Sequence, residues 1–228
     1  MVTSDRLPPG QSLLDGFPRF GLPAYMQGWP AVPANLTLAI GGLVDQPLQL
    51  RVAELMAVAR TELTADFHCV ATWSRTDVRW GGVPFRDVYE QIIVRDARPD
   101  PAARWVRFRG LDGYFATLQL DDALAADVLL ADMLAGEPLP LEHGAPLRLV
   151  APAHYGYKSV KHLAGIELRE RFSPKRAKAA GFVEHPRARA LAEERSRGTP
   201  GPVVRELYAA MLPHLLHAYE ASVHPPGA

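Results

Sequence analysis

Cys69 is the only cysteine in the chain, and its thiol is the side chain best suited to act as a nucleophile or a soft metal ligand. The adjacent His68 suggests a cysteine–histidine pair. The stretch Thr64–Ala71, however, alternates in polarity like a half-buried strand, in which successive side chains point to opposite faces. His68 is therefore poorly placed to activate its neighbour.

Three interpretations of Cys69 remain open. The commonest fate of a lone cysteine is to be a small core residue. A cysteine hydrolase would need a histidine from elsewhere in the chain, with His143 and His154 as candidates. A single thiolate cannot hold zinc alone, but it can complete a metal site whose other sulfurs belong to a cofactor.

Three basic residues further along the chain could bind an anion such as a phosphate. Arg148 offers a planar fork of donors, and Lys158 and Lys161 offer point charges. The stretch Gly156–Lys161 is expected to lead into a helical turn at Ser159–Leu163, whose backbone N–H groups would face the anion. The alternative is that the two lysines form a solvated surface pair.

Two long motifs resemble those of a known family. The segment Asp66–Val83 (DFHCVATWSRTDVRWGGV) is similar to the cysteine motif of the sulfite-oxidase-like molybdopterin oxidoreductases. The segment Leu139–Glu167 resembles the family's second signature, a His/Asn-Gly-x-Pro-x-Arg strand followed by Gly-x-Lys/Arg-x-x-Lys, and the intervening GYFATL also matches. The likeness spans about Phe17 to Arg195, and it is nearest to small bacterial members such as the catalytic subunits of methionine sulfoxide reductase systems.

The resemblance implies a molybdenum–molybdopterin cofactor, with the metal bound by two dithiolene sulfurs of the pterin and by the Cys69 thiolate. It implies catalytic roles for Cys69 and for Tyr114, which occupies the place of the active-site tyrosine of true sulfite oxidases. The positions that match cofactor-binding residues of the family are His143 and Arg148 at the pterin, Lys158, Ser159, Val160 and Lys161 at its phosphate, Phe17 and Phe20 in the N-terminal arm, and His68, Cys69 and Gly110.

The residues that follow Cys69 bear on the substrate. In the true sulfite oxidases of the family that this chain resembles, a basic residue stands just beyond the cysteine. This chain has the uncharged run from Val70 to Trp73 there. The resemblance implies two-electron oxygen-atom transfer, and this uncharged run favours a neutral or weakly charged small substrate, with reduction of a sulfoxide or N-oxide preferred. One alternative is sulfite oxidation, if Arg75, Arg107 or Arg109 turns into the pocket. The other is a non-catalytic binding domain that has kept the fold and lost the cofactor.

Short elements of both kinds must position these residues. Apolar periodicity predicts helices and strands without a regular βαβ rhythm, so the expected fold is α+β, with mixed sheets of short strands and short helices of the sulfite-oxidase type. The predicted strands are Leu36–Ile40, Thr64–Ala71, Trp105–Arg109, Tyr114–Leu120, Val128–Leu134, Leu147–Val150 and Gly165–Arg169, and the predicted helices are Val52–Arg60 and Phe85–Val94.

The two ends of the chain differ from this pattern. Met1–Pro33 is rich in proline and glycine and is expected to be an extended arm. A basic, proline-marked tail follows Phe172, and Val203–Val223 has the spacing of an amphipathic helix bent at Pro213. We therefore expect a molybdopterin-binding oxidoreductase domain over residues 1–195 and a C-terminal amphipathic helix within residues 196–228.

Composition limits the possible partners. The 25 basic and 25 acidic residues cancel, which gives no reason to expect a nucleic-acid partner. No apolar run reaches the roughly 18 residues of a membrane span. The first residues lack an apolar segment and a twin-arginine pair, so a cytoplasmic location is predicted. The expected partners are a small-molecule substrate and a separate electron-transfer protein, and the expected state is a monomer.

Overall fold

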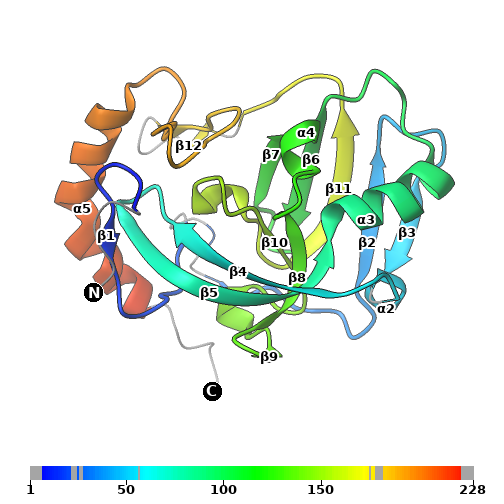
Figure 1. The fold of residues 1–228 in the computed structure, drawn as a ribbon, viewed down its shortest axis with the longest axis horizontal. Coiled ribbons are helices and arrows are strands. Elements are labelled where there is room, and N and C mark those ends of the chain that lie inside the picture. Colours follow the sequence, from blue (N-terminus) through cyan, green and yellow to red (C-terminus); the bar gives the residue numbers. More distant parts are fainter. Residues whose placement is uncertain are drawn as a thin grey trace.

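The computed structural model describes residues 7–21, 25, 28–55, 57–174, 176–177 and 182–221. A large sheet runs across the molecule (Figure 1). Its strands are β1 (Ser12–Leu13), β4 (Thr61–His68), β5 (Trp73–Pro84), β8 (Leu129–Leu134), β9 (Glu137–Pro138) and β10 (Arg148–Val150). Their order is β1-β5-β8-β10, with β4 also paired to β5 and β9 to β8. The long strand β5 thus joins β1, β4 and β8.

A second, smaller sheet has both parallel and antiparallel neighbours. Its order is β3 (Leu48–Arg51), β2 (Thr37–Gly42), β11 (Leu163–Arg169), β6 (Trp105–Gly110) and β7 (Phe115–Gln119). β11 runs parallel to β2 and antiparallel to β6. Mixed sheets accompanied by a few helices confirm the predicted α+β class.

The helices are short except at the end of the chain. They are α2 (Val52–Leu55), α3 (Phe85–Val88), the π-helix η2 (Tyr89–Ala97) that continues it, α4 (Leu120–Ala123), the 3₁₀ turns η3 (Leu141–His143) and η4 (Gly156–Lys158), and α5 (Gly201–Ala221). A small hairpin, β12 (Arg176–Ala177) and β13 (Phe182–Val183), precedes α5. Among the described residues, no helix combines the length and apolar composition that a membrane crossing requires.

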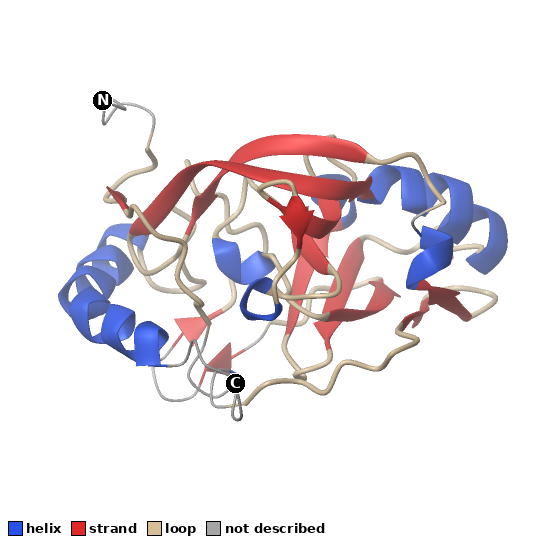
Figure 2. Ribbon diagram, turned by 90° about the horizontal axis from the view of Figure 1, so that it is seen from below, coloured by secondary structure: helices blue, strands red, loops and turns tan. Residues whose placement is uncertain are grey.

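Two hydrophobic cores lie on opposite faces of the large sheet. Alternation along β8 shows this directly, because Leu130 belongs to one core while Leu129 and Ala131 belong to the other. The first core is largely aliphatic and is shared with the small sheet and α3. The second contains Cys69 and several aromatic rings, and α5 packs against it. Figure 2 shows α5 at one end of the molecule and the helical segment formed by α3 and η2 at the other.

Several expected elements differ from those observed. Neither β3 nor β5 is among the strands expected from the sequence, and the helix expected over Val52–Arg60 is only the single turn α2. The residues of β5 do not alternate cleanly, because Asp77 has a φ of 55° and the register with β8 shifts at Gly81 and Gly82. The prediction of a helical turn at Ser159–Leu163 is wrong. The turn η4 ends at Lys158, and β11 already begins at Leu163.

The C-terminal helix docks on the chain's own surface. Val204 and Tyr219 are buried, and Tyr208, Leu212, Leu215 and Leu216 pack against the second core. Leu207 and Met211, which the periodic pattern also assigns to the apolar face, are 52% and 39% exposed. The stripe that contacts the domain is therefore rotated relative to the predicted one, and Val223 lies outside the described residues.

Candidate functional site

Cys69 lies in a tight turn just beyond the end of β4. Its backbone N–H donates to the carbonyl of Trp73 at 2.8 Å, and the N–H of Thr72 donates to the Cys69 carbonyl at 3.2 Å. Thr72 has a φ of 69°, which is unusual for a β-branched residue. The Cys69 side chain is 6% exposed, and burial raises the pKa of its thiol to about 12. A nearby cation is therefore required before this sulfur becomes a thiolate.

His68 does not serve Cys69. Its Nδ1 atom lies 2.8 Å from the Ser74 hydroxyl, and burial lowers the pKa of the ring. The Ser74 hydroxyl donates to Gln11, whose amide nitrogen donates to the Cys69 carbonyl at 3.0 Å. His154 is also occupied, because its Nδ1 atom is hydrogen-bonded to the carbonyl of Arg187. His68 thus supports the turn through Ser74 and Gln11. Neither His68 nor His154 is placed to activate Cys69 as a cysteine hydrolase would require.

Arg148 and Lys161, which we call the cation pair, are the most unusual charges near this turn. Arg148 is fully buried, donates to the His143 carbonyl at 2.8 Å, and lies 4.8 Å from the centroid of the Trp80 ring. Lys161 donates to the carbonyls of Phe20 at 3.0 Å and Glu142 at 2.8 Å. Within the part of the chain that the structure describes, neither has an ion pair with a carboxylate.

Burial disfavours the charge on both members of the cation pair, and repulsion by Arg148 adds to the effect at Lys161. Burial lowers the pKa of Arg148 to about 9. It also lowers the pKa of Lys161 well below the ordinary range, and the charge of Arg148 adds to that effect. Asp112 and Glu142 offset the lowering of the Lys161 pKa only in part, and neither cation has a direct ion pair among the described residues, so a bound anion would relieve the remaining cost.

His143 supplies a neutral polar group beside the cation pair. It is 8% exposed, and its Nδ1 atom has no hydrogen-bond partner. Burial is the main reason that its pKa falls to about 3, and the charges of Lys161 and Arg148 contribute. The following Gly144 has a φ of 110°, and a Cβ there would lie 2.9 Å from the Lys161 Cβ, so only glycine lets the lysine pass. The imidazole is thus neutral, with one nitrogen available to a ligand.

The N-terminal arm closes over these groups with aromatic rings. Phe17 stacks on His143 with a centroid distance of 4.7 Å and lies 5.8 Å from the ring of Trp80. Phe20 lies 4.4 Å from the Lys161 ammonium. In the described part of the chain, a soft sulfur, two cations without a direct ion pair and an imidazole nitrogen without a hydrogen-bond partner, under aromatic cover, fit an anionic, sulfur-bearing, heterocyclic cofactor.

The other positions that match the family's cofactor-binding residues have mixed placements. Val160 is buried, and the Ser159 hydroxyl accepts the Ala151 N–H at 3.2 Å. A Cβ at Gly110 would lie 2.5 Å from the Lys161 carbonyl, so Gly110 borders the cation pair. The ammonium of Lys158 is directed elsewhere, 2.7 Å from Glu184 and 2.6 Å from the Thr117 carbonyl. We therefore leave Lys158 out of the candidate site.

Tyr114 is partly buried, and its hydroxyl donates to the Tyr157 carbonyl at 2.5 Å. Burial raises the pKa of this phenol well above its ordinary value, and the charge of Glu184 adds to the effect. The sulfur of Cys69 contributes as well, which places the two side chains within electrostatic range. Donation to a substrate would require Tyr114 to exchange its present partner.

The arginines considered as substrate cations are engaged away from Cys69. Arg75 donates to the Leu14 carbonyl at 3.2 Å, and Arg109 pairs with Glu167 at 2.7 Å. Arg107 lies 3.9 Å from the same Glu167. The cations whose charge reaches Cys69 are Arg195 and Lys161. The sequence contains no signal for Arg195, because it belongs to no motif and lies in a charge-rich tail that is expected to be exposed.

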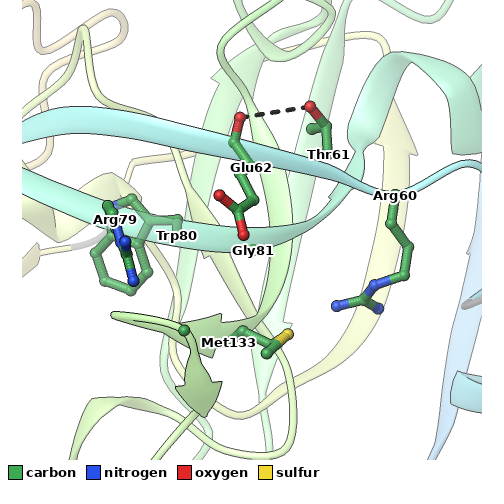
Figure 3. Close-up of a pocket in the computed structure, with 8 residues that line it drawn as sticks. Arg60, Thr61, Glu62, Arg79, Trp80, Gly81 and Met133 are labelled. Carbon is green, nitrogen blue, oxygen red and sulfur yellow. Dashed lines mark hydrogen bonds between the residues drawn. The ribbon is translucent and has the colours of Figure 1, made fainter.

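A hollow of about 230 Å³ borders the site without containing it. It is lined by Arg60, Thr61, Glu62, Arg79, Trp80, Gly81, Met133 and Gly136. Figure 3 shows Arg60 and Arg79 on its two sides in that view. Trp80, whose ring also meets Arg148, is the residue shared with the candidate site.

Comparison with known proteins gives consistent results. Residues 26–177 match the family described as the oxidoreductase molybdopterin binding domain. Over 176 residues the chain is 38% identical to the uncharacterized oxidoreductase YuiH of Bacillus subtilis, which covers 75% of this chain and 83% of that protein. Over 160 residues it is 36% identical to the protein-methionine-sulfoxide reductase catalytic subunit MsrP of Gluconobacter oxydans, covering 62% of this chain and 49% of the relative.

A second MsrP, from Xanthomonas axonopodis pv. citri, is 32% identical over 197 residues, covering 76% of this chain and 61% of the relative. The chain therefore spans between about half and three fifths of these two MsrP proteins. Among solved structures, the sulfane dehydrogenase SoxCD of Paracoccus pantotrophus aligns with a TM-score of 0.52 at 22% identity, covering 65% of this chain and 44% of that chain. The likeness to SoxCD supports the fold alone.

Proposed function

Because the chain belongs to the family of molybdopterin-binding oxidoreductases, we propose that it reduces a sulfoxide or an N-oxide by oxygen-atom transfer, with the cofactor bound between Cys69 and the cation pair. The observation that carries this proposal is a cation pair without a carboxylate ion pair among the described residues, the buried Arg148 and the partly buried Lys161, near the buried Cys69. Nothing in a purely structural core requires such charges, whereas a phosphate-bearing cofactor does.

The chain's own residues divide the work of holding the cofactor. Cys69 supplies a thiolate to molybdenum, and Arg148 and Lys161 supply charge-assisted hydrogen bonds to the pterin and its phosphate. His143 offers its unpartnered Nδ1 atom, while Phe17 and Phe20 exclude water. When bound, the cofactor supplies two-electron redox chemistry that no side chain can provide.

The preference for an uncharged substrate rests on the turn that carries Cys69. Its residues from Val70 to Trp73 bring no charge, and Arg75, Arg107 and Arg109 have partners elsewhere. Two relatives described above are named methionine-sulfoxide reductase subunits. Reduction of a sulfoxide to a thioether consumes two electrons and two protons and releases water. Tyr114 is the proposed proton or hydrogen-bond donor to the departing oxygen.

Several wider expectations belong to this proposal. The electrons would come from a separate electron-transfer protein. The oxidoreductase domain would end near residue 195, with residues 196–228 as an appended helical segment. A cytoplasmic location and a monomeric state remain predictions, to be measured by cell fractionation and by sedimentation.

The test is metal analysis and assay of protein made in a molybdenum-replete host. The protein should contain about one molybdenum atom per chain and should oxidise a reduced dye when given methionine sulfoxide or an N-oxide. The variant Cys69→Ser should remain folded and lose this activity. Turnover of sulfite alone would replace the proposed substrate class, and stoichiometric zinc without molybdenum would refute the proposed function.

A further inference from the structure

Arg195 is a fully buried arginine that lies outside residues 26–177, the part of the chain that matches the family. It lies between the β12–β13 hairpin and α5. Its guanidinium stacks over the ring of Tyr155 at 5.0 Å from the centroid. A buried arginine needs a specific set of acceptors, and the identity of those acceptors reveals what it does.

The two terminal nitrogens of Arg195 bind two segments that are distant in sequence. Nη1 donates to the carbonyl of Val70 at 2.7 Å, and Nη2 donates to the carbonyl of Pro9 at 2.7 Å. Val70 immediately follows Cys69, and Pro9 belongs to the N-terminal arm. The planar fork of one side chain therefore ties the cysteine turn to the arm.

The remaining nitrogen connects this fork to the C-terminal helix. The Arg195 Nε atom lies 3.4 Å from Glu193, and Glu193 also pairs with Arg205 of α5 at 2.8 Å. The single negative charge of Glu193 is shared by Arg195 and Arg205, so the three side chains together keep one net positive charge. The Val70 carbonyl that Arg195 binds at 2.7 Å belongs to the residue next to Cys69, so the guanidinium lies close to the cysteine turn.

The cysteine turn depends on these outside contacts. Two backbone hydrogen bonds, between Cys69 and Trp73 and between Thr72 and Cys69, are internal to the turn, and Thr72 adopts an unfavourable φ of 69°. Two side chains anchor its carbonyls, Gln11 at Cys69 and Arg195 at Val70. A turn with an unfavourable φ persists only where its surroundings fix it.

We propose that Arg195 is a positioning residue for Cys69, which fixes the turn through the Val70 carbonyl and places a buried positive charge beside the metal that Cys69 binds. This inference rests on the proposed function, because it takes Cys69 as the ligand. Fixing the turn fixes the direction of the sulfur, and a nearby positive charge favours the reduced metal. The segment beyond the family domain is thus part of the metal site.

Two substitutions separate geometry from charge. Arg195→Lys keeps the charge but cannot span both carbonyls, and Arg195→Met removes both. The matched control is Arg205→Met, which breaks a second arginine's bond to Glu193 without touching the turn. Hydrogen exchange of the Cys69 and Thr72 amides reports the geometry with or without metal, and the Mo(V) spectrum and midpoint potential report the metal.

In Arg195→Lys, exchange at these two amides should accelerate by at least about tenfold, since hydrogen bonds to charged groups are the stronger ones. Its Mo(V) spectrum should differ from that of the parent. The potential should fall in Arg195→Met, and Arg205→Met should match the parent in all three measurements. Exchange rates and a Mo(V) spectrum in Arg195→Lys equal to those of the parent and the control would overturn the proposal.

The two proposals fail in different ways. If the parent protein holds no molybdenum, the proposed function is wrong, while the exchange measurement still decides whether Arg195 fixes the turn. If Arg195→Met does not accumulate as folded protein, Arg195→Lys decides alone, because it retains the buried charge.

Discussion

Lys158 and Lys161 are three positions apart in the sequence, and their ammonium groups have different electrostatic surroundings. Lys158 is fully buried, and its ammonium meets Glu184 at 2.7 Å and the carbonyls of Thr117 and Pro186. Lys161 is partly buried, meets two carbonyls, and feels the like charge of Arg148. Lys158 has a direct carboxylate partner within the chain, whereas Lys161 has none among the described residues.

The difference separates a structural charge from one prepared for a ligand. Glu184 also accepts the Thr117 N–H at 2.9 Å, so the Lys158–Glu184 pair joins the tail, β7 and η4. The cation pair, in contrast, donates to carbonyls and forms no ion pair with a carboxylate among the described residues, although Asp112 and Glu142 act on Lys161 from a distance. Motif matching treats the two lysines alike, whereas their environments predict different responses to substitution.

The largest expected effect on stability is at the compensated charge. Glu184→Gln keeps an acceptor for the Thr117 N–H but leaves Lys158 buried without an opposite charge. Loss of one partner of a buried pair costs about 3–5 kcal/mol in the free energy of unfolding. Denaturant titration checks this, and the double variant Lys158→Met/Glu184→Gln, which keeps the acceptor for the Thr117 N–H, should recover most of the loss. A single variant as stable as the parent would show that the pair is not buried.

A smaller effect, on cofactor binding, is expected at the cation pair. Arg148→Met removes charge-assisted hydrogen bonds worth roughly 1.5–3 kcal/mol, so the cofactor should bind about 10- to 150-fold more weakly. The cofactor-free variant should lose less stability than Glu184→Gln, because an uncompensated charge has been removed. Pterin and molybdenum content per folded chain provide the measurement. The double variant at Lys158 and Glu184 serves as the control and should keep its cofactor.

The smallest effect concerns pH and His143. The folded-state pKa is lowered to about 3, mainly by burial, whereas the ordinary value is 6.5. Both states are neutral well above pH 6.5, and as the pH falls through this value the unfolded chain alone gains the proton, so stability falls with pH. Between pH 7 and pH 5.5 the loss due to this residue is about 1.3 kcal/mol. His143→Asn should reduce the fall in stability between pH 7 and pH 5.5 by that amount; an unchanged pH profile would contradict the burial of a neutral ring.

Local sequence was informative where the chemistry is local. Alternation in Thr64–Ala71 separates Cys69 from His68, although β4 ends at His68 and leaves Cys69 in a turn. The His-Gly pair at 143–144 and the spacing to Lys161 reflect a close approach that only glycine permits. These signals lie within short segments, so a pattern can carry them.

Long-range partners were not predictable in this way. The sequence around Lys158 contains no signal that Glu184, 26 residues further along the chain, is its ion-pair partner. Arg195 reaches Val70 and Pro9 across most of the chain. The strand β5 was missed because its irregular register hides the two-residue period. Tertiary contacts decide these cases, and periodicity contains no information about them.

The most direct test of the central claim is the sulfur coordination of molybdenum, measured by X-ray absorption on the parent protein and on Cys69→Ser. The parent should contain molybdenum and the substitution should remove one sulfur neighbour from it, while the Lys158→Met/Glu184→Gln variant should give the parent spectrum. Molybdenum with the same sulfur coordination in Cys69→Ser, or a parent protein without molybdenum, would contradict this claim.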